Sequence, residues 1–484
     1  MDLPIALDSQ TSRPLHQQLY DELRLAILSG RLHPRQRLPS TRSLAQSLGI
    51  SRSTVTQSYD RLLGEGYLES IQGSGTYVCA QLPDELLCSE PVKSTVESVL
   101  APVKLSNYGK QVAQMPLKLQ TEPATVINFR YGRPALNLFP MGIWRKLISR
   151  HCRVANWLDY ATDFQGYLPL REAIARYLSR VRAVQCNANQ IVITNGTQQA
   201  LDLIMRLFIQ PEETIAVEEP GYLSARRIFL SHRARLFPVP VDESGLVVEA
   251  LASHDQTIRL VYVTPSHQFP TGAILSLPRR LELLAWAQHN SALILEDDYD
   301  SEYRYGDRPI PALQGLDRHH RVIYIGTFSK VLFPSLRIGY LVAPPHLVSL
   351  LAQVKWLSDR QLPLLDQLVL TDFIEQGYLE SHIRRMRSYY DQNRQVLVQS
   401  LKQAFADRVT ILGEQAGIHL MVRFRTRFTD AEIIERAATM QVGLMSAQPH
   451  YLHSGDRGEF ILGYGELTPE QIQQGVYQLA KALK

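Results

Sequence analysis

Long apolar stretches, secretory features and cysteines are all scarce in this 484-residue sequence. No run of about 18 apolar residues occurs, so no membrane-spanning helix is expected. The opening residues, MDLPIALDSQ, lack the basic segment and apolar core of a secretory signal. The four cysteines are spaced like neither a metal site nor a disulfide framework. These absences predict a cytoplasmic protein with reduced thiols and no metal site.

Charged residues make up only 20% of the chain and the net charge is +4, which says little about binding partners. The distribution is more informative, because residues 31–61 contain six arginines and a single acid, Asp60. Such a local excess suits a surface that contacts phosphates. On charge alone, a solvated surface is the simpler explanation.

Residues 40–63 carry the pattern of two short helices joined by a tight turn. Ser40 and Ser51 stand where each helix needs a capping side chain, and Gly49 ends the first helix. Two such helices predict a helix-turn-helix. The buried face of the second helix is expected to hold Val55, Tyr59, Leu62 and Leu63.

The exposed face of this second helix is polar near its N-terminus, where it carries Ser51, Arg52, Ser53, Thr54 and Gln57. Such side chains suit phosphate and base-edge contacts in the major groove of DNA. The following segment, GYLESIQGSGTYV, alternates like a hairpin around its glycines, which predicts a winged domain. A small helical domain that binds no DNA is the alternative.

The segment from residue 18 to residue 78, and above all the run RLPSTRSLAQSLGISRSTV, resembles the winged helix of the GntR family. The resemblance implies binding to operator DNA. It places one set of side chains at the DNA, namely Arg42, Ser51, Arg52, Thr54 and Gln57. It also makes the turn from Gly73 to Gly75 the tip of the wing.

Periodicity changes twice along the chain, which predicts three segments. Residues 1–80 form the winged domain, and residues 81–124 form a linker interrupted by five prolines. A third small domain is the less favoured interpretation of the linker. From residue 125 to residue 484, helical stretches alternate with short apolar strands, which predicts an α/β domain with a mainly parallel sheet covered by helices.

Residues with cofactor chemistry follow four of these predicted strands, where ligands bind in parallel sheets. Thr197 begins a helix and suits a phosphate, and Tyr222 can stack on a flat ring. The strand ALILEDD ends in acids that can keep a pyridine nitrogen protonated. Lys330, in the turn TFSK, can form a Schiff base, and Arg337 can bind a phosphate. Each residue alone is more simply explained by packing or solvation, but together they predict a pyridoxal phosphate site.

Residues 125–484 resemble the fold-type I aminotransferases through the motifs FQGYLPLREAIARYL, NGTQQAL, EEPGY, PSHQFPTG, EDDYD and SKVLFPSLRIGY, in that order. The resemblance implies that Lys330 carries the cofactor and that Asp297 pairs with the pyridine nitrogen, or Asp298 if the register is off by one. It implies that Tyr160 reaches the site across a dimer interface. It also implies that Tyr222 stacks on the cofactor ring and that Tyr299 binds the ring oxygen. The phosphate ligands that it implies are Thr197, Gln198, Thr327 and Arg337.

Two positions depart from the aminotransferase pattern. Phe269 replaces the asparagine of NPTG, which leaves the ring oxygen to Tyr299 or His267. Ile461 stands where aminotransferases carry the arginine that binds the substrate carboxylate, and the nearby Arg457 does not align with it. Cofactor binding is still expected, whereas turnover of amino acids is in doubt.

A GntR winged helix followed by an aminotransferase-like domain resembles the MocR-type transcriptional regulators over nearly the whole chain. The resemblance implies a homodimer in which pyridoxal phosphate, or its adduct with an amine effector, changes the affinity for operator DNA. Two alternatives stay open: a working aminotransferase with an accessory DNA-binding domain, and a DNA-binding protein whose large domain only dimerises. The absent arginine argues against the first, and the intact Lys330, Asp297 and Arg337 argue against the second.

Overall fold

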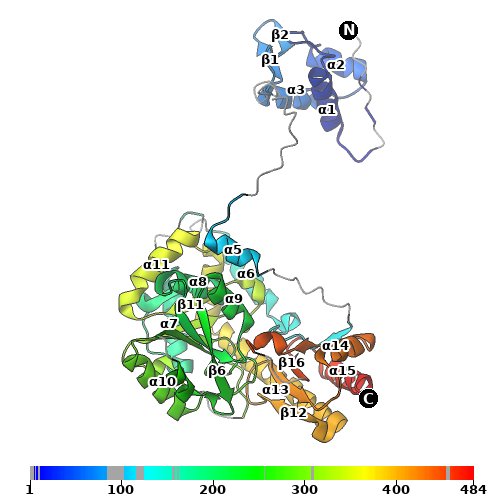
Figure 1. Cartoon of the computed structure of the whole chain (residues 1–484). Coiled ribbons are helices and arrows are strands. Elements are labelled where there is room, and N and C mark those ends of the chain that lie inside the picture. The colour runs from blue at the N-terminus through cyan, green and yellow to red at the C-terminus, as the bar shows by residue number, and fades with distance from the viewer. Residues whose placement is uncertain are drawn as a thin grey trace. The chain divides into compact units, whose positions relative to one another are not determined.

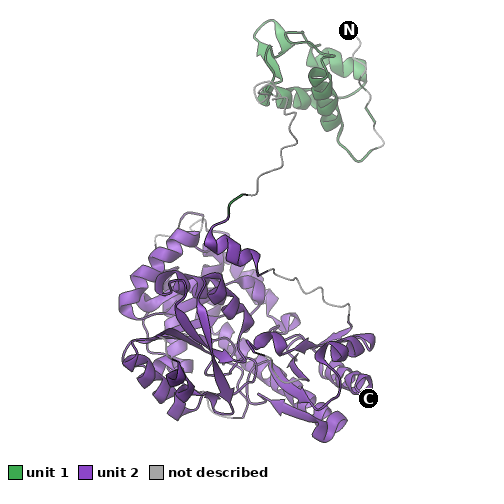
Figure 2. Cartoon of the chain, viewed as in Figure 1, with its two compact units in different colours: residues 1–104 green, residues 105–484 purple. Residues whose placement is uncertain are grey.

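The structure is a computed structural model, and it describes residues 5, 7–8, 11–83, 103–115, 125–154, 158–160, 163–254, 257–306, 310–453 and 458–484. The chain divides into two compact units, residues 1–104 and 105–484 (Figure 2). Most of the predicted linker, residues 84–102 and 116–124, lies outside the described residues, as does Arg457. No described helix is both long and apolar enough to cross a lipid bilayer.

The first unit contains the predicted helix-turn-helix and hairpin (Figure 1). Its elements are α1 (Leu15–Leu28), α2 (Thr41–Leu48), α3 (Arg52–Gly64), β1 (Leu68–Ile71) and β2 (Gly75–Val78). Ser40 caps α2 by accepting from the backbone N–H of Ser43, and Gly49 ends it in the left-handed conformation, with a φ of 65°. Ser51 caps α3 through the N–H of Thr54.

One apolar core holds this unit together. Leu19 and Leu23 of α1 pack there with Val55 and Leu62 of α3, and all four are fully buried. The predicted buried face of α3 is confirmed, except that Leu63 is only partly buried.

An eight-stranded sheet forms the centre of the second unit, in the order β4-β11-β10-β9-β8-β5-β6-β7. Its strands are β4 (Ile191–Thr194), β5 (Thr214–Glu219), β6 (Arg235–Asp242), β7 (Gly245–Leu246), β8 (Ile258–Val263), β9 (Leu293–Asp298), β10 (Val322–Thr327) and β11 (Gly339–Val342). Among the described residues, β11 and β7 run opposite to the other six strands of this sheet. The predicted mainly parallel sheet is therefore confirmed.

Helices cover both faces of this sheet (Figure 1). They are α6 (Met141–His151), α7 (Leu168–Arg182), α8 (Gly196–Phe208), α9 (Leu223–Ser231), α10 (Leu277–His289), α11 (Pro345–Asp359) and α12 (Leu364–Glu375). Ile191 and Ile193 of β4 pack with α6, α7 and α12, whereas Val192 packs with α8, α9 and α11. Burial on both sides explains why the strands are continuous apolar runs in the sequence.

A long helix, α13 (Tyr378–Phe405), leads into a smaller C-terminal layer. Its sheet has the order β12-β13-β16-β15 and is flanked by α14 and α15. These elements are β12 (Val409–Leu412), β13 (His419–Phe424), α14 (Asp430–Thr439), β15 (Met445–Ser446), β16 (Glu459–Gly463) and α15 (Pro469–Ala482). Two short strands, β3 (Ile127–Asn128) and β14 (Val442–Gly443), pair in parallel, and α5 (Asn107–Ala113) packs on α9.

Candidate functional site

One cavity of about 160 Å³ lies at the carboxyl ends of the parallel strands. Side chains that follow β5, β9 and β10, and the first turn of α8, converge on it because these strands all end at the same edge of the sheet. Every residue predicted to bind the cofactor lines it: Thr197, Gln198, Tyr222, Asp297, Tyr299, Thr327, Lys330 and Arg337. The structure thus brings these residues together, while their individual roles stay a prediction.

Lys330 follows β10, and its amine faces the backbone of another segment of the cavity wall. The Nζ atom donates to the carbonyl oxygen of Gly132 at 2.8 Å. A Cβ at Gly132 would lie only 2.8 Å from Nζ, so a side chain there would displace the amine. Burial lowers the pKa of the Lys330 amine, while the carboxylates of Asp300 and Asp297 oppose that shift. A lysine with a lowered pKa is uncharged more often, which makes it a better nucleophile.

The N-terminus of α8 forms one end of the cavity, with Thr197 and Gln198 in its first turn. Arg337 lies against this turn and donates from Nη2 to the carbonyl oxygen of Asn195 at 3.0 Å. A Cβ at Gly196 would come within 2.8 Å of that Nη2, so glycine permits the close approach. A guanidinium beside a helix N-terminus is well suited to a phosphate group.

The two neighbouring acids at the end of β9 have different partners. Asp297 lines the cavity, where its Oδ2 accepts from the Tyr262 hydroxyl at 2.7 Å and its buried Oδ1 has no hydrogen-bond partner among the described residues. Burial raises the pKa of Asp297 to about 7. Asp298 instead accepts from Arg182 at 2.8 Å and from Tyr324 at 2.6 Å, and it does not line the cavity. The Oδ1 of Asp298 is also buried without a partner among the described residues, but only Asp297 lines the cavity. Asp297 is therefore the acid that fits a protonated pyridine nitrogen, whereas Asp298 is held by Arg182.

Aromatic rings form one wall of the cavity. Tyr222 stands at the N-cap of α9 and meets Phe269 edge to face, with ring centroids 5.6 Å apart. Tyr131 lies 5.2 Å from the same phenylalanine ring. The Tyr299 hydroxyl donates to the carbonyl oxygen of His267 at 2.9 Å. A wall of this kind suits a flat ligand ring with a polar edge.

Ile461 is fully buried in an apolar cluster with Phe269, Met421 and Ala447. The two positions that depart from the aminotransferase pattern therefore pack in one cluster. An isoleucine has no hydrogen-bond donor for a carboxylate. The cluster is consequently apolar at the position where an aminotransferase carries its arginine, and Ile461 itself does not line the cavity.

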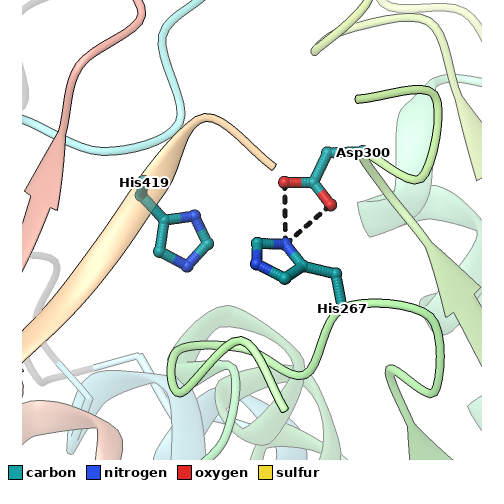
Figure 3. A group of neighbouring side chains, drawn as sticks. All are labelled: His267, Asp300 and His419. Carbon is teal, nitrogen blue, oxygen red and sulfur yellow. Dashed lines mark hydrogen bonds and ion pairs between the residues drawn. The ribbon is translucent and has the colours of Figure 1, made fainter. Parts of the chain in front are cut away.

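Three further buried side chains lie together, namely His267, Asp300 and His419 (Figure 3). Asp300 and His419 line the cavity, and His267 lies behind Asp300. The Nδ1 of His267 lies 3.0 and 3.1 Å from the two carboxylate oxygens of Asp300. The Nε2 atoms of both histidines are buried without a hydrogen-bond partner among the described residues. Burial holds the pKa of His419 well below its usual value, so this imidazole is neutral.

Tyr262, Asp300 and His419 are among the cavity residues that have no role in the sequence-based prediction. Asp300 belongs to the motif EDDYD, so the local sequence held a signal for it. Tyr262 lies within β8 and His419 begins β13, and only the tertiary fold brings them to the cavity. No local pattern could have identified these two residues.

The predicted DNA-contacting side chains of the first unit differ in their exposure and in their hydrogen bonds. Arg42, Arg52 and Gln57 are exposed. Ser51 and Thr54 are engaged with each other, because the Ser51 hydroxyl accepts from the Thr54 N–H at 3.2 Å and lies 3.1 Å from the Thr54 hydroxyl. The two arginines and the glutamine are therefore the long side chains that this surface offers to DNA.

The predicted wing tip is a glycine turn with positive φ angles, 77° at Gly73 and 128° at Gly75. Residues 35–38 hydrogen-bond to β2 and add a third segment to the wing. The Nε of Arg37 lies 3.0 Å from where a Cβ on Gly75 would stand. Arg37, which is exposed and was not among the predicted contacts, thus brings a cation to the wing.

Comparison with protein families finds a match in each unit. Residues 15–78 match the family described as "Bacterial regulatory proteins, gntR family". Residues 155–473 match the family "Aminotransferase class I and II".

Two regulators are among the similar curated proteins. The chain is 41% identical to the "Probable rhizopine catabolism regulatory protein MocR" of Rhizobium meliloti, over 99% of this chain and 95% of that protein. It is 36% identical to the "HTH-type pyridoxine biosynthesis transcriptional regulator PdxR" of Corynebacterium glutamicum, over 83% of this chain and 82% of that protein.

Solved structures of aminotransferases resemble the second unit. The α-aminoadipate aminotransferase LysN of Thermus thermophilus, complexed with N-(5'-phosphopyridoxyl)-L-leucine, is 29% identical, with a TM-score of 0.68 over 74% of this chain and 92% of that chain. A multiple substrate aminotransferase of Thermococcus profundus is 29% identical, with a TM-score of 0.71 over 78% of this chain and 97% of that chain. The chain therefore belongs to the MocR-type regulators of the GntR family, which join a winged helix-turn-helix to an aminotransferase-like domain for pyridoxal phosphate.

Proposed function

We propose that this protein changes its affinity for operator DNA when pyridoxal phosphate, or an adduct of the cofactor with an amine effector, occupies the cavity of the second unit. It acts in the cytoplasm. The observation that carries the proposal is the buried, partnerless Oδ1 of Asp297, which faces the same cavity as the Lys330 amine. A pyridine aldehyde needs these two groups, one for its ring nitrogen and one for its aldehyde carbon.

The cavity residues divide by role. Lys330 holds the cofactor covalently, Asp297 keeps the pyridine nitrogen protonated, and Tyr222 stacks on the ring. The Tyr299 hydroxyl turns from the backbone of His267 to the ring oxygen. Pyridoxal phosphate, when bound, supplies an aldehyde carbon that amines attack. Its phosphate is held at the α8 end of the cavity by Thr197, Gln198, Thr327 and Arg337.

The first unit binds operator DNA with the N-terminal end of α3 in the major groove. Arg52 and Gln57 contact base edges, and Arg42 contacts the phosphate backbone. Ser51 and Thr54 approach phosphates at the start of the helix, and the turn from Gly73 to Gly75 enters the neighbouring groove. The exposure of the three long side chains supports this arrangement.

The second unit forms a homodimer. Tyr160 does not line the cavity of its own chain, and its side chain is 64% exposed beside the Arg360 guanidinium. Trp356 and Phe164 lie nearby in sequence, partly exposed and in ring contact at 6.0 Å, and Leu357 is 74% exposed. Exposed apolar side chains of this kind mark an interface.

The dimer is tested by light scattering of two leucine variants. Leu357→Asp is expected to give a monomer. Leu281→Asp, at a leucine of α10 that is 52% exposed, is expected to leave the mass of the dimer unchanged. A monomeric wild-type protein would contradict the proposal.

Transamination is the second candidate function, favoured by the intact Lys330 and Asp297. The apolar cluster around Ile461 weighs against it, because a substrate carboxylate finds no cationic side chain at that position. Lys330 and Asp297 would also hold the cofactor in a sensor, which requires no turnover.

The proposal is tested by the absorbance of the purified protein. Wild-type protein with pyridoxal phosphate is expected to show a visible band, and borohydride is expected to fix the cofactor to the peptide that contains Lys330. Lys330→Ala is expected to lose both the band and the fixation, whereas Lys146→Ala, at an exposed lysine of α6, keeps them. A visible band that survives in Lys330→Ala would contradict the assignment of Lys330 as the residue that carries the cofactor.

A further inference from the structure

Asp300 is a second buried carboxylate of the cofactor cavity, and the proposed roles leave it unused. It lines the cavity together with Asp297 and Lys330, and its side chain is 1% exposed. We infer that Asp300, held in place by His267, is the counter-ion of the nitrogen through which Lys330 carries the cofactor. The inference rests on the proposed attachment of the cofactor to Lys330.

The packing around Asp300 fixes the direction in which its carboxyl group points. Both of its oxygens face the Nδ1 of His267, at 3.0 and 3.1 Å, so this nitrogen carries the proton that the carboxylate accepts (Figure 3). Gly417 is part of the same arrangement, because a Cβ there would lie 2.5 Å from an Asp300 oxygen and 2.1 Å from the His267 ring. The pair therefore occupies space that any side chain at position 417 would fill.

The two carboxylates of the cavity serve different nitrogens. Asp297 has one oxygen bound to Tyr262 and the other free for the pyridine nitrogen. Of the two acids, Asp300 has the larger effect on the Lys330 amine and raises its pKa against burial. A cofactor held between them would have one carboxylate for its ring nitrogen and one for its link to the lysine.

Other ionisable side chains also surround the Lys330 amine and the Asp300 carboxyl group. Lys330 also faces Arg337 and Arg130, which lower the pKa of its amine. Asp300 faces the carboxyl of Glu302 and four phenols, Tyr299, Tyr303, Tyr305 and Tyr464. Burial raises the pKa of each of these phenols, so they stay neutral and add no negative charge beside the lysine.

The charge of Asp300 has a consequence for sensing. A protonated nitrogen makes the adjoining carbon more electrophilic, and only then does an amine replace the lysine readily. Asp300 therefore sets the pH range in which an effector amine is accepted. A regulator without this carboxylate would bind the cofactor and still respond poorly to amines at neutral pH.

The test is a pH titration of the visible absorbance band in the full-length protein loaded with pyridoxal phosphate. The midpoint for loss of the proton is expected to fall by roughly 1–3 units in Asp300→Asn and in Asp300→Ser, the range that one nearby opposite charge contributes. Glu302→Gln, at a neighbouring acid that does not line the cavity, is expected to keep the wild-type midpoint. Prior dialysis of the wild type against EDTA is expected to change nothing.

Each other outcome contradicts the inference. A wild-type midpoint in both Asp300 variants removes the counter-ion role. Loss of the cofactor from both variants, with the fold intact by circular dichroism, assigns Asp300 to binding and not to titration. A midpoint that moves after EDTA treatment means that a metal ion holds Asp300 in place of His267. A wild-type protein without any visible band refutes instead the proposed attachment to Lys330, so the two failures are distinguishable.

Discussion

The two units position their functional side chains over very different lengths of chain. In the winged helix, the predicted DNA surface runs from Arg42 to Gly75, and serine caps and glycine turns fix it locally. The cofactor cavity draws its wall from residues as far apart as Tyr131 and His419. A local pattern therefore identifies the first site, whereas the second exists only after the strands of the sheet have assembled.

The choice between Asp297 and Asp298 also depends on the folded strand. Successive residues of a strand point to opposite faces of a sheet, so one acid faces the cavity and the other faces Arg182. The sequence left the choice between them open, because it shows adjacency and not direction. Their different partners give two variants with different expected effects.

The largest effect is expected from Arg182→Ala, which leaves Asp298 buried without its cation. Breaking a buried pair in this way costs about 3–5 kcal/mol. All four tryptophans lie in the second unit, so denaturation followed by tryptophan fluorescence measures the stability of that unit alone. Arg176→Ala on the same helix is the control, because its exposed pair with Glu375 is expected to contribute less than about 1 kcal/mol. Equal stability of the two variants would contradict the account of Asp298.

Asp297→Asn is expected to change the pH dependence of stability in the absence of cofactor. Burial raises the pKa of Asp297 from 3.8 to about 7, so its contribution is fully present below about pH 4 and is lost as the pH rises through 7. Between about pH 5 and pH 8, the free energy of unfolding of the cofactor-free wild type should therefore fall by at least about 1 kcal/mol relative to that of Asp297→Asn.

Pyridoxal phosphate is expected to reverse this order at the higher pH, because the carboxylate then pairs with the pyridine nitrogen. Tryptophan fluorescence during denaturation, with and without cofactor, measures both effects. If the free energies of unfolding of the wild type and Asp297→Asn differ by the same amount across the pH range, Asp297 does not titrate in the folded protein. If cofactor stabilises both equally, Asp297 does not contact the ring nitrogen.

Arg52→Ala is expected to weaken operator binding by about 1–3 kcal/mol if this side chain contacts a base edge, and to relax specificity at that position. If it contacts only phosphate, binding weakens on every sequence and the salt dependence falls. Arg61→Ala, near the other end of α3 and paired with Glu65, is the matched control. Gel-shift titration at moderate salt makes the comparison, and an unchanged affinity in Arg52→Ala removes it from the interface.

The smallest effect is expected in amino-acid turnover. Ile461 offers no donor to a substrate carboxylate, and loose positioning costs orders of magnitude in rate. Mixed with a common amino acid in a single-turnover experiment, the loaded protein should keep its visible band and release little keto acid. Rapid loss of the band, with recovery on adding a keto acid, would mean that another residue replaces the missing arginine.

The sequence predicted most of the architecture, because caps, glycine turns and apolar runs are local signals. The strand at residues 293–298 lies where the apolar run ALILEDD predicted it. The helix α5 formed inside the segment predicted to be an irregular linker, and its contact with α9, which includes Tyr108 on His232, is not visible in the local pattern.

The candidate site was predictable as far as its residues follow strands. Asp297 and Lys330 lie at the carboxyl ends of two neighbouring strands, at the same edge of the sheet. The order of the motifs was therefore enough to group them. His419 and Tyr262 reach the cavity only through long-range packing. The His267–Asp300 pair depends on the missing Cβ of Gly417, a contact across more than a hundred residues that periodicity does not encode.

Operator affinity with and without pyridoxal phosphate tests the central claim most directly. Duplexes that the full-length protein selects from a random pool serve as the operator, and affinity is measured by fluorescence anisotropy for the wild type and for Lys330→Ala. The wild-type affinity is expected to change by about fivefold or more on adding the cofactor, and the Lys330→Ala affinity is expected to stay constant. A wild-type protein that shows the visible band and yet binds its operator equally well with and without cofactor would contradict the account.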